Sequence, residues 1–229
     1  MDKEVIKIDL IILGESDVGK TSLFTRFAKN TFSESYLATI GIDFYLKEYE
    51  LPSYKLNVKL WDTAGQEKLR AITSSSIKKA DGVAICYDIT KQDSFEQMSY
   101  WIQDVKEKAL QVPVIIIGNK IDCENLLFEN EEQLAEDFAK KNDFQYFRCS
   151  AKSGENVEHA FFTLLKLVME HKKYDSNELC KWLKKEKKIN VGKGMKSTKG
   201  KEDNSKKQDK KIKLEKESPS DKKKKKCCK

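Results

Sequence analysis

Short apolar runs alternate with amphipathic stretches along most of this chain, and this alternation constrains the fold more than any other feature. The runs VIKIDLIIL, GVAICYD and VPVIIIGN are rich in branched aliphatic residues and are about as long as one strand. Apolar residues then recur at helical spacing in the stretches between them. Such alternation predicts an α/β fold, in which a mostly parallel sheet carries helices on both faces.

The strand-like runs are sufficient for a six-stranded sheet. Residues 43–51 and 55–62 are separated by a short turn, so we expect a hairpin that supplies one antiparallel edge strand. The expected strands are 5–13, 43–51, 55–62, 82–88, 112–119 and 145–150, and the expected helices are 20–29, 94–108, 131–141 and 156–172.

The charge of the chain changes sign toward its C-terminal end. Residues 181–229 hold 21 lysines and 7 acidic residues, a net of +14, and the whole chain carries +7, which leaves −7 on the first 180 residues. A lysine-rich stretch with few apolar residues cannot offset the entropy of ordering, so we expect it to be disordered. We divide the chain into a domain at 1–175, a candidate helix extension at 176–188 and a tail at 189–229.

The sequence also bears on location and redox state. The N-terminus has no signal-like apolar core, and no apolar run reaches the roughly 18 residues of a membrane-spanning helix, so we expect a cytoplasmic protein. Cys86, Cys123, Cys149 and Cys180 lack the spacing of a metal site. In a reducing compartment they should be free thiols.

Residues 14–21, GESDVGKT, lie between the first expected strand and the first expected helix. They match the phosphate-binding pattern G-x-x-x-x-G-K-[ST] in the context that this motif requires. The glycines let the main chain wrap around an anion, and the helix N-terminus adds positive charge. In such a loop Lys20 reaches the β- and γ-phosphates, and Thr21 places its hydroxyl on Mg²⁺. A plain glycine turn is the alternative, and the flanking strand and helix argue against it.

Two further motifs also follow expected strands, where ligands of α/β sheets bind. They are NKID at 119–122 and SAK at 150–152. Taken alone, NKID is equally consistent with a polar turn. Together and in this order, the three motifs resemble those of the small GTPases of the Ras superfamily.

This resemblance implies how the base is recognised. Asp122 would accept hydrogen bonds from the N1 and N2 edge of guanine, a donor pair that adenine lacks. Asn119 and Lys120 would brace the base pocket. The Ala151 N–H would meet the guanine O6.

The resemblance also places two segments at the γ-phosphate. Asp62 would hold Mg²⁺ through water, and Thr39 would complete the magnesium shell. The Gly65 N–H would contact the γ-phosphate, and Gln66 would orient the attacking water. Phe32 would pack on the guanine ring. Loss of the γ-phosphate would release both segments, which is the logic of a GTP-dependent switch.

The implied site is extensive. Its catalytic residues are Lys20, Gly65 and Gln66, its metal ligands are Thr21, Thr39 and Asp62, and its nucleotide-binding residues are Ser16, Asp17, Val18, Gly19, Lys20, Thr21, Ser22, Phe32, Tyr36, Thr39, Gly65, Asn119, Lys120, Asp122, Ser150, Ala151 and Lys152.

The segments IGIDF and WDTAGQEKLR and the terminal CCK most resemble the Rab branch, over residues 5–170 and the last few residues. The resemblance implies geranylgeranyl groups on Cys227 and Cys228, and two lipid chains suffice for stable anchoring. The lysines at 222–226 would add about 1 kcal/mol each on anionic lipid. A monomeric traffic switch is implied, which cycles between the cytosol and the cytoplasmic face of an endomembrane. Its partners would be an exchange factor, a GTPase-activating protein, a GDP dissociation inhibitor and effectors.

Alternatives remain for the tail and for the activity. The tail could be a solvated segment with two incidental thiols, or it could bind nucleic acid. It has no aromatic residue after Trp182 on which bases could stack, and the domain is acidic, so we expect no nucleic-acid partner. The protein could also be a nucleotide-bound scaffold with negligible turnover, and Gln66 argues against that reading.

The chain departs from the Rab pattern at two places. Many Rab proteins carry a small residue at the position of Asp17, and a carboxylate there would disfavour bound phosphates and speed nucleotide release. The alternative is that this side chain turns outward at little cost. In the second departure, Ser76 and Ile77 stand where the family usually has two tyrosines. The first of those tyrosines usually belongs to a surface aromatic cluster with the residues at the positions of Phe44 and Trp61.

Overall fold

The computed structural model describes residues 3–34, 42–63, 75–109 and 111–187. The chain divides into one compact unit that ends at Gly194 and a second unit, 195–229, which lies outside the described residues. Six of the residues named above also lie outside them, namely Tyr36, Thr39, Gly65, Gln66, Cys227 and Cys228.

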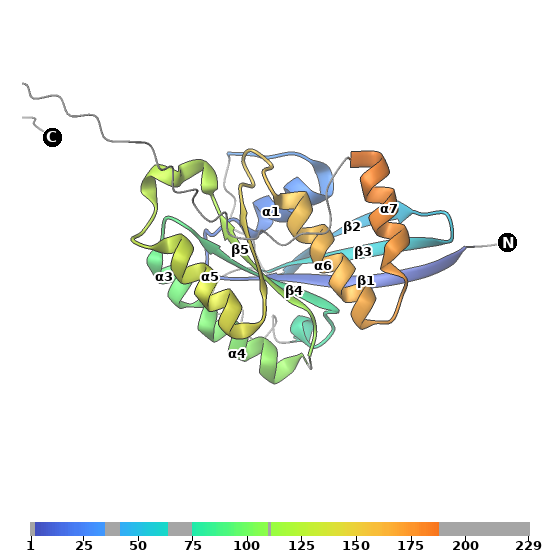
Figure 1. The fold of residues 1–229 in the computed structure, drawn as a ribbon, viewed down its shortest axis with the longest axis horizontal. Coiled ribbons are helices and arrows are strands. Elements are labelled where there is room, and N and C mark those ends of the chain that lie inside the picture. The colour runs from blue at the N-terminus through green and yellow to red at the C-terminus, as the bar shows by residue number, and fades with distance from the viewer. Residues whose placement is uncertain (1–2, 35–41, 64–74, 110, 188–229) are drawn as a thin grey trace, which may run out of the picture. The chain divides into compact units, whose positions relative to one another are not determined.

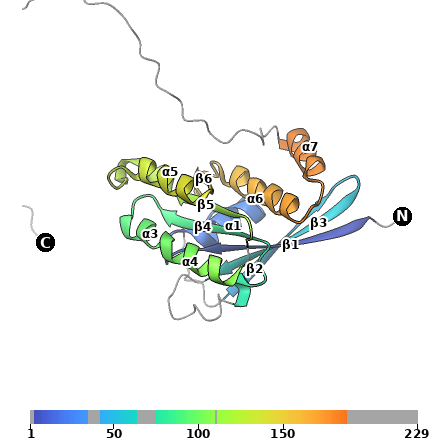
Figure 2. The same ribbon diagram turned by 60° about the horizontal axis from the view of Figure 1, so that its bottom comes forward.

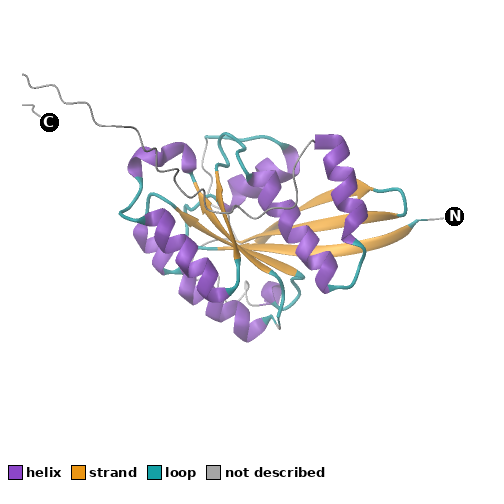
Figure 3. Ribbon diagram, in the orientation of Figure 1, coloured by secondary structure: helices purple, strands orange, loops and turns teal. Residues whose placement is uncertain are grey.

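The first unit contains a single sheet flanked by helices (Figures 1 and 3). The strand order is β2-β3-β1-β4-β5-β6, and the β2–β3 pair alone is antiparallel. This arrangement confirms the predicted six-stranded P-loop GTPase fold with its antiparallel edge strand. The elements are β1 (Glu4–Leu13), α1 (Lys20–Lys29), β2 (Ile42–Glu50), β3 (Tyr54–Thr63), β4 (Gly82–Asp88), α3 (Gln92–Glu96), α4 (Met98–Lys108), β5 (Val114–Asn119), the 3₁₀ helix η2 (Ile121–Leu126), α5 (Glu131–Asn142), β6 (Gln145–Cys149), α6 (Val157–His171) and α7 (Ser176–Lys187).

Alternation along the central strands divides the core into two layers. In β1, Ile8 and Leu10 face the layer that holds α1, α6 and α7, whereas Ile11 and Leu13 face the layer that holds α4 and α5. Figure 2 shows the sheet passing between α6 and α4. Burial on both faces explains why these strands read as continuous apolar runs rather than as alternating ones.

Two of the expected elements differ from the structure by more than one residue at an end. The single helix expected at 94–108 is two helices, separated at Gln97, whose φ of −68° and ψ of −13° are closer to 3₁₀ than to α geometry. Strand β5 begins at Val114 rather than at residue 112. Pro113 lacks the N–H that would extend the ladder, although its carbonyl still accepts a hydrogen bond of 2.9 Å from the Val83 N–H.

Helix α7 is separate from α6 and packs on the β2–β3 hairpin (Figure 1). Leu179 and Leu183 are fully buried, and the Trp182 ring meets Tyr49 edge-on at a centroid distance of 5.4 Å. The Ser53 N–H also donates to a Glu178 carboxylate oxygen at 2.7 Å. These contacts make α7 part of the folded unit.

Two further observations concern the described residues only. None of their helices combines the length and apolar character needed to cross a bilayer. Cys86, Cys123, Cys149 and Cys180 are free thiols.

Candidate functional site

The loop at residues 14–19 has a backbone that requires glycine at both ends. Gly14 has φ of 141° and Gly19 has φ of 93°, both in the region that favours glycine. A Cβ atom at Gly14 would overlap the main-chain oxygen of Cys86, and one at Gly19 would overlap the amide nitrogen of Asn119. The loop therefore lies directly against β4 and against the end of β5.

Lys20 is the first residue of α1, and its ammonium group lies inside this loop. Its Nζ donates to the carbonyl oxygens of Gly14 at 2.9 Å and Glu15 at 2.6 Å. Burial lowers the pKa of Lys20, while charges that include Asp62 and Glu15 oppose that shift. A buried cation at the start of a helix is suited to hold phosphate oxygens.

Asp62, near the end of β3, forms the acidic side of the site. Both its carboxylate oxygens are buried. Burial raises the pKa of Asp62 to about 6, and the Thr21 hydroxyl and the Lys20 ammonium lower it less strongly. The described residues contain no cluster of three or more metal-ligating side chains. Mg²⁺ needs none, because it binds through one or two protein oxygens together with phosphates and waters, so Thr21 and Asp62 fit this ion.

Asn119 joins three of the loops at the carboxyl edge of the sheet. Its side chain is buried, its Nδ2 donates to the Val18 carbonyl at 2.8 Å, and its Oδ1 accepts from the Ala151 N–H at 3.1 Å. The Ser150 hydroxyl donates to Asp122 Oδ1 at 2.6 Å. The predicted phosphate and base motifs are thus connected by direct hydrogen bonds.

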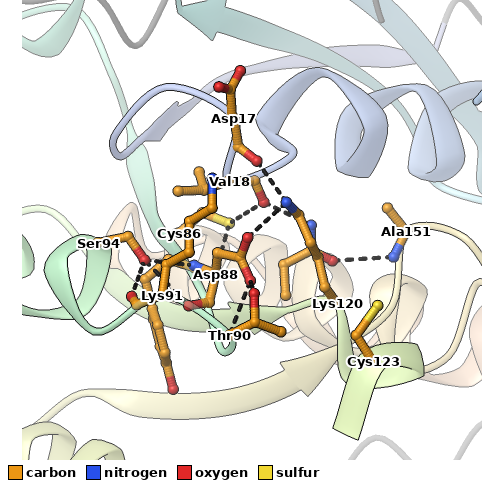
Figure 4. A network of polar contacts seen from close by, with 12 residues as sticks. Asp17, Val18, Cys86, Asp88, Thr90, Lys91, Ser94, Lys120, Cys123 and Ala151 are labelled. Carbon is orange, nitrogen blue, oxygen red and sulfur yellow. Dashed lines mark hydrogen bonds and ion pairs between the residues drawn. The ribbon is translucent and has the colours of Figure 1, made fainter. Parts of the chain in front are cut away.

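Lys120 makes a second connection (Figure 4). Its Nζ donates to the main-chain oxygen of Asp17 at 2.7 Å and lies 2.6 Å from an Asp88 carboxylate oxygen. Asp17 has φ of 65°, and its exposed carboxylate points away from the contacts drawn in Figure 4. Lys152 is on the surface, where it pairs with Glu34 at 3.1 Å.

Three other predicted residues have less specific surroundings. Ser16 is exposed, and Ser22 is half-buried on α1. Phe32 is half-buried against the core layer of α1 and α6.

Sequence reasoning missed two residues that hold the loops of the NKID and SAK motifs. Arg26 of α1 donates to the carbonyls of Ala151 at 2.9 Å and Lys152 at 2.6 Å, and Asp88 holds Lys120. No local pattern marks Arg26, because its partners lie 125 and 126 residues away. Asp88 could have been found, since it is a carboxylate at the end of a strand that is buried throughout.

The two residues of the second departure from the Rab pattern lie in the interior of the domain, and the aromatic surface at Phe44 and Trp61 is formed without them. Ser76 and Ile77 are both buried. The Phe44 and Trp61 rings lie 5.9 Å apart, and the Lys59 ammonium sits 4.2 Å and 3.8 Å from their centroids. The exposed surface at this point combines two rings with a positive charge.

A phosphate-loop motif, a buried carboxylate and the NKID and SAK loops meet at the carboxyl edge of this sheet, and this arrangement defines a P-loop nucleotide-binding domain. The Ras family model matches residues 9–170. GTP-binding protein ypt1 of Schizosaccharomyces pombe is 40% identical over 162 residues, which cover 70% of this chain and 79% of that protein. Ras-related protein Rab-1 of Theileria parva is 41% identical over 172 residues, which cover 73% and 77%. Ras-related protein Rab-13 of Rattus norvegicus is 39% identical over 161 residues, which cover 70% and 79%. The chain belongs to the Ras family and, within it, is a Rab small GTPase.

Proposed function

We propose that this GTP-hydrolysing regulator of vesicle traffic binds guanine nucleotide in the loops joined by Asn119, with Mg²⁺ held by Thr21 and Asp62. The observation that carries the proposal is the hydrogen-bonded connection of the phosphate loop to the SAK loop through one buried amide. A single ligand with a phosphate end and a base end fits such a connection.

The phosphate end depends on charge and main-chain donors. Lys20 exchanges its loop carbonyls for the β- and γ-phosphate oxygens, and the first N–H groups of α1 face the same anion. When bound, Mg²⁺ neutralises charge that develops on the phosphates. Gln66 orients the attacking water, and Gly65 and Thr39 respond to the γ-phosphate. An activating protein supplies the arginine that accelerates a slow intrinsic reaction.

The base end depends on Asp122. Ser150 holds one of its carboxylate oxygens, which fixes the plane of the group for the N1 and N2 donors of guanine. Lys120 and Ala151 complete the pocket, and Phe32 packs on the ring. Adenine is disfavoured because it would leave this carboxylate without its donor pair.

Effectors, an exchange factor and a GDP dissociation inhibitor bind the two segments that respond to the γ-phosphate, those of Thr39 and of Gly65. The aromatic surface of Phe44 and Trp61, with Lys59 over it, lies on the strands between those segments. An effector for this surface offers an apolar patch with an acidic or carbonyl group for the lysine. The protein acts as a monomer.

Attachment to the cytoplasmic face of an endomembrane depends on geranylgeranyl groups at Cys227 and Cys228 and on the lysines at 222–226. Tagged full-length protein should localise to one organelle. The double variant Cys227→Ser with Cys228→Ser should be cytosolic. An unchanged distribution would contradict lipid anchoring, and salt-sensitive binding to RNA as strong as that to anionic vesicles would favour a nucleic-acid partner.

Single-turnover hydrolysis tests the catalytic assignment. The full chain is loaded with GTP and Mg²⁺, and phosphate release is followed for the parent and for Gln66→Leu. We expect at least a tenfold slower reaction in the variant, because the water loses its orienting group. Equal rates would favour a nucleotide-bound scaffold, and failure to load either GTP or GDP would refute the proposed function.

A further inference from the structure

Asp88 is a buried carboxylate that the proposed chemistry does not use. It ends β4, and its side chain is only 1% exposed. Its Oδ1 accepts hydrogen bonds from the Thr90 N–H at 2.9 Å and the Thr90 hydroxyl at 2.7 Å. The Ser94 hydroxyl accepts from the Asp88 N–H at 3.0 Å and donates to the Lys91 carbonyl at 2.7 Å (Figure 4). The position of this carboxylate is therefore determined by its own strand and the turn that follows.

The other oxygen, Oδ2, faces Lys120. It lies 2.6 Å from the lysine Nζ, and no other described residue donates a hydrogen bond to it. Asp88 pairs with Asn119 in the register of β4 and β5, which brings the next residue, Lys120, alongside it. A buried carboxylate with one cationic partner is strongly dependent on that partner, because the unpaired charge would be costly to bury.

Lys120 transmits this constraint to the phosphate loop. Its Nζ also donates to the main-chain oxygen of Asp17 at 2.7 Å, and its side chain is 33% exposed. Lys120 has φ of 74° and Asp17 has φ of 65°, left-handed conformations that cost energy in residues other than glycine. Such conformations persist where neighbouring contacts hold them, and the shared ammonium group contacts one of them directly.

We propose that Asp88 is a positioning residue that prolongs the lifetime of bound guanine nucleotide by holding Lys120 against the phosphate loop. The inference rests on the proposed function. Asp88 acts through Lys120, which both closes the base pocket and fixes the Asp17 carbonyl. Without the carboxylate, a partly exposed lysine samples several rotamers in solvent, and the main-chain donors of the loop are less often aligned with the phosphates.

The first test compares GDP release from the parent and from Asp88→Asn, with the full chain loaded with fluorescent GDP at fixed Mg²⁺. Asparagine keeps an acceptor for Thr90 and removes the charge. Release should be about tenfold faster, because a charge-assisted contact is replaced by a weaker neutral one. A rate equal to that of the parent would overturn the proposal.

Asp81→Asn is a matched control at the opposite end of β4. Asp81 also pairs with a lysine, Lys172, at 2.6 Å, and it accepts the Asp9 N–H at 2.9 Å. Its loss should lower the melting temperature while GDP release stays within about twofold of the parent. Equal acceleration by both substitutions would indicate a general loss of stability and would contradict a positioning role.

A double-variant cycle separates positioning from structural support. If Asp88 acts through Lys120, then Asp88→Asn should add little to the faster release caused by Lys120→Met, whereas independent effects multiply. Multiplying effects would overturn the proposal. If Asp88→Asn does not fold, Thr90→Val loosens the same carboxylate and should speed release two- to threefold, and an unchanged rate would overturn the proposal. A parent protein that takes up no GDP would refute the proposed function instead.

Discussion

The variant Asn119→Asp tests whether the Asn119 side-chain amide holds the phosphate loop and the SAK loop together. Asn119 is 1% exposed, and the substitution keeps its shape. The oxygen that accepts the Ala151 N–H at 3.1 Å remains. The nitrogen that donates to the Val18 carbonyl at 2.8 Å becomes an oxygen, so two acceptors face each other in a buried position.

The expected magnitude follows from these two contacts. Loss of the hydrogen bond costs about 1 kcal/mol, and a buried carbonyl left with only the weak Cys86 S–H donor, at 3.8 Å, costs about 1–3 kcal/mol more. A total of about 2–4 kcal/mol corresponds to roughly 30- to 700-fold weaker binding, which we expect mainly as faster GDP release.

The loss of GDP binding in Asn119→Asp should become larger as pH rises. Burial and the Val18 carbonyl both favour the protonated form of the introduced carboxyl, so its pKa should lie above the usual range. The protonated group can donate to Val18, so binding should improve at low pH and be lost as pH rises through this pKa. Burial also raises the pKa of Asp62 to about 6, so the parent must be measured at every pH as a control.

Fluorescent GDP release from the full chain at fixed Mg²⁺ is the assay. Asn156→Asp is the matched control, because Asn156 Nδ2 also donates to a main-chain carbonyl, that of Arg148 at 2.7 Å, and neither residue is among those assigned to the nucleotide. It should lower stability and leave GDP release within about twofold of the parent. An effect of Asn119→Asp below about threefold, with the same pH dependence as the parent, would refute the reasoning.

Two further predictions concern α7 and Asp17. Leu183→Ala should destabilise the GDP-bound protein by about 2–5 kcal/mol, because Leu183 is fully buried. The control Lys181→Ala, at an exposed position of α7, should change stability little. Equal melting temperatures of the two variants would mean that α7 is dispensable for stability. Asp17→Asn and Asp17→Gly should slow GDP release about two- to fivefold, because the Asp17 carboxylate acts on Lys20 at the phosphate position, and the difference should shrink at high salt. Release rates equal to the parent would show that the outward side chain carries no such cost.

The architecture was predictable because each central strand is buried on both faces and therefore leaves a continuous apolar run. The break at Gln97 was not, since nothing in MSYWIQDVKEK or the residues before it interrupts helical spacing. The role of α7 was left open for a similar reason. Its apolar residues gain their burial from α6 and from the hairpin, and its sequence is nearly as lysine-rich as the tail.

The site was predictable to the extent that its chemistry is local. The loop at 14–21 combines glycines, a lysine and a hydroxyl in one segment, so the pattern alone indicates a phosphate site. The contacts that assemble the site are tertiary. Arg26 and Asp88 are single polar residues whose partners come from other loops, and periodicity carries no information about such pairs.

The register of the sheet explains why these contacts converge. Asp88 and Asn119 are neighbours at the ends of β4 and β5, and Asn119 and Cys149 are neighbours at the ends of β5 and β6. Asn119 therefore stands between the phosphate loop and the SAK loop, and Lys120 can reach Asp17 and Asp88 together. Because the base and phosphate loops share these side chains, a substitution at either end should change the binding of the whole nucleotide, and the effects of substitutions within this network should not be additive.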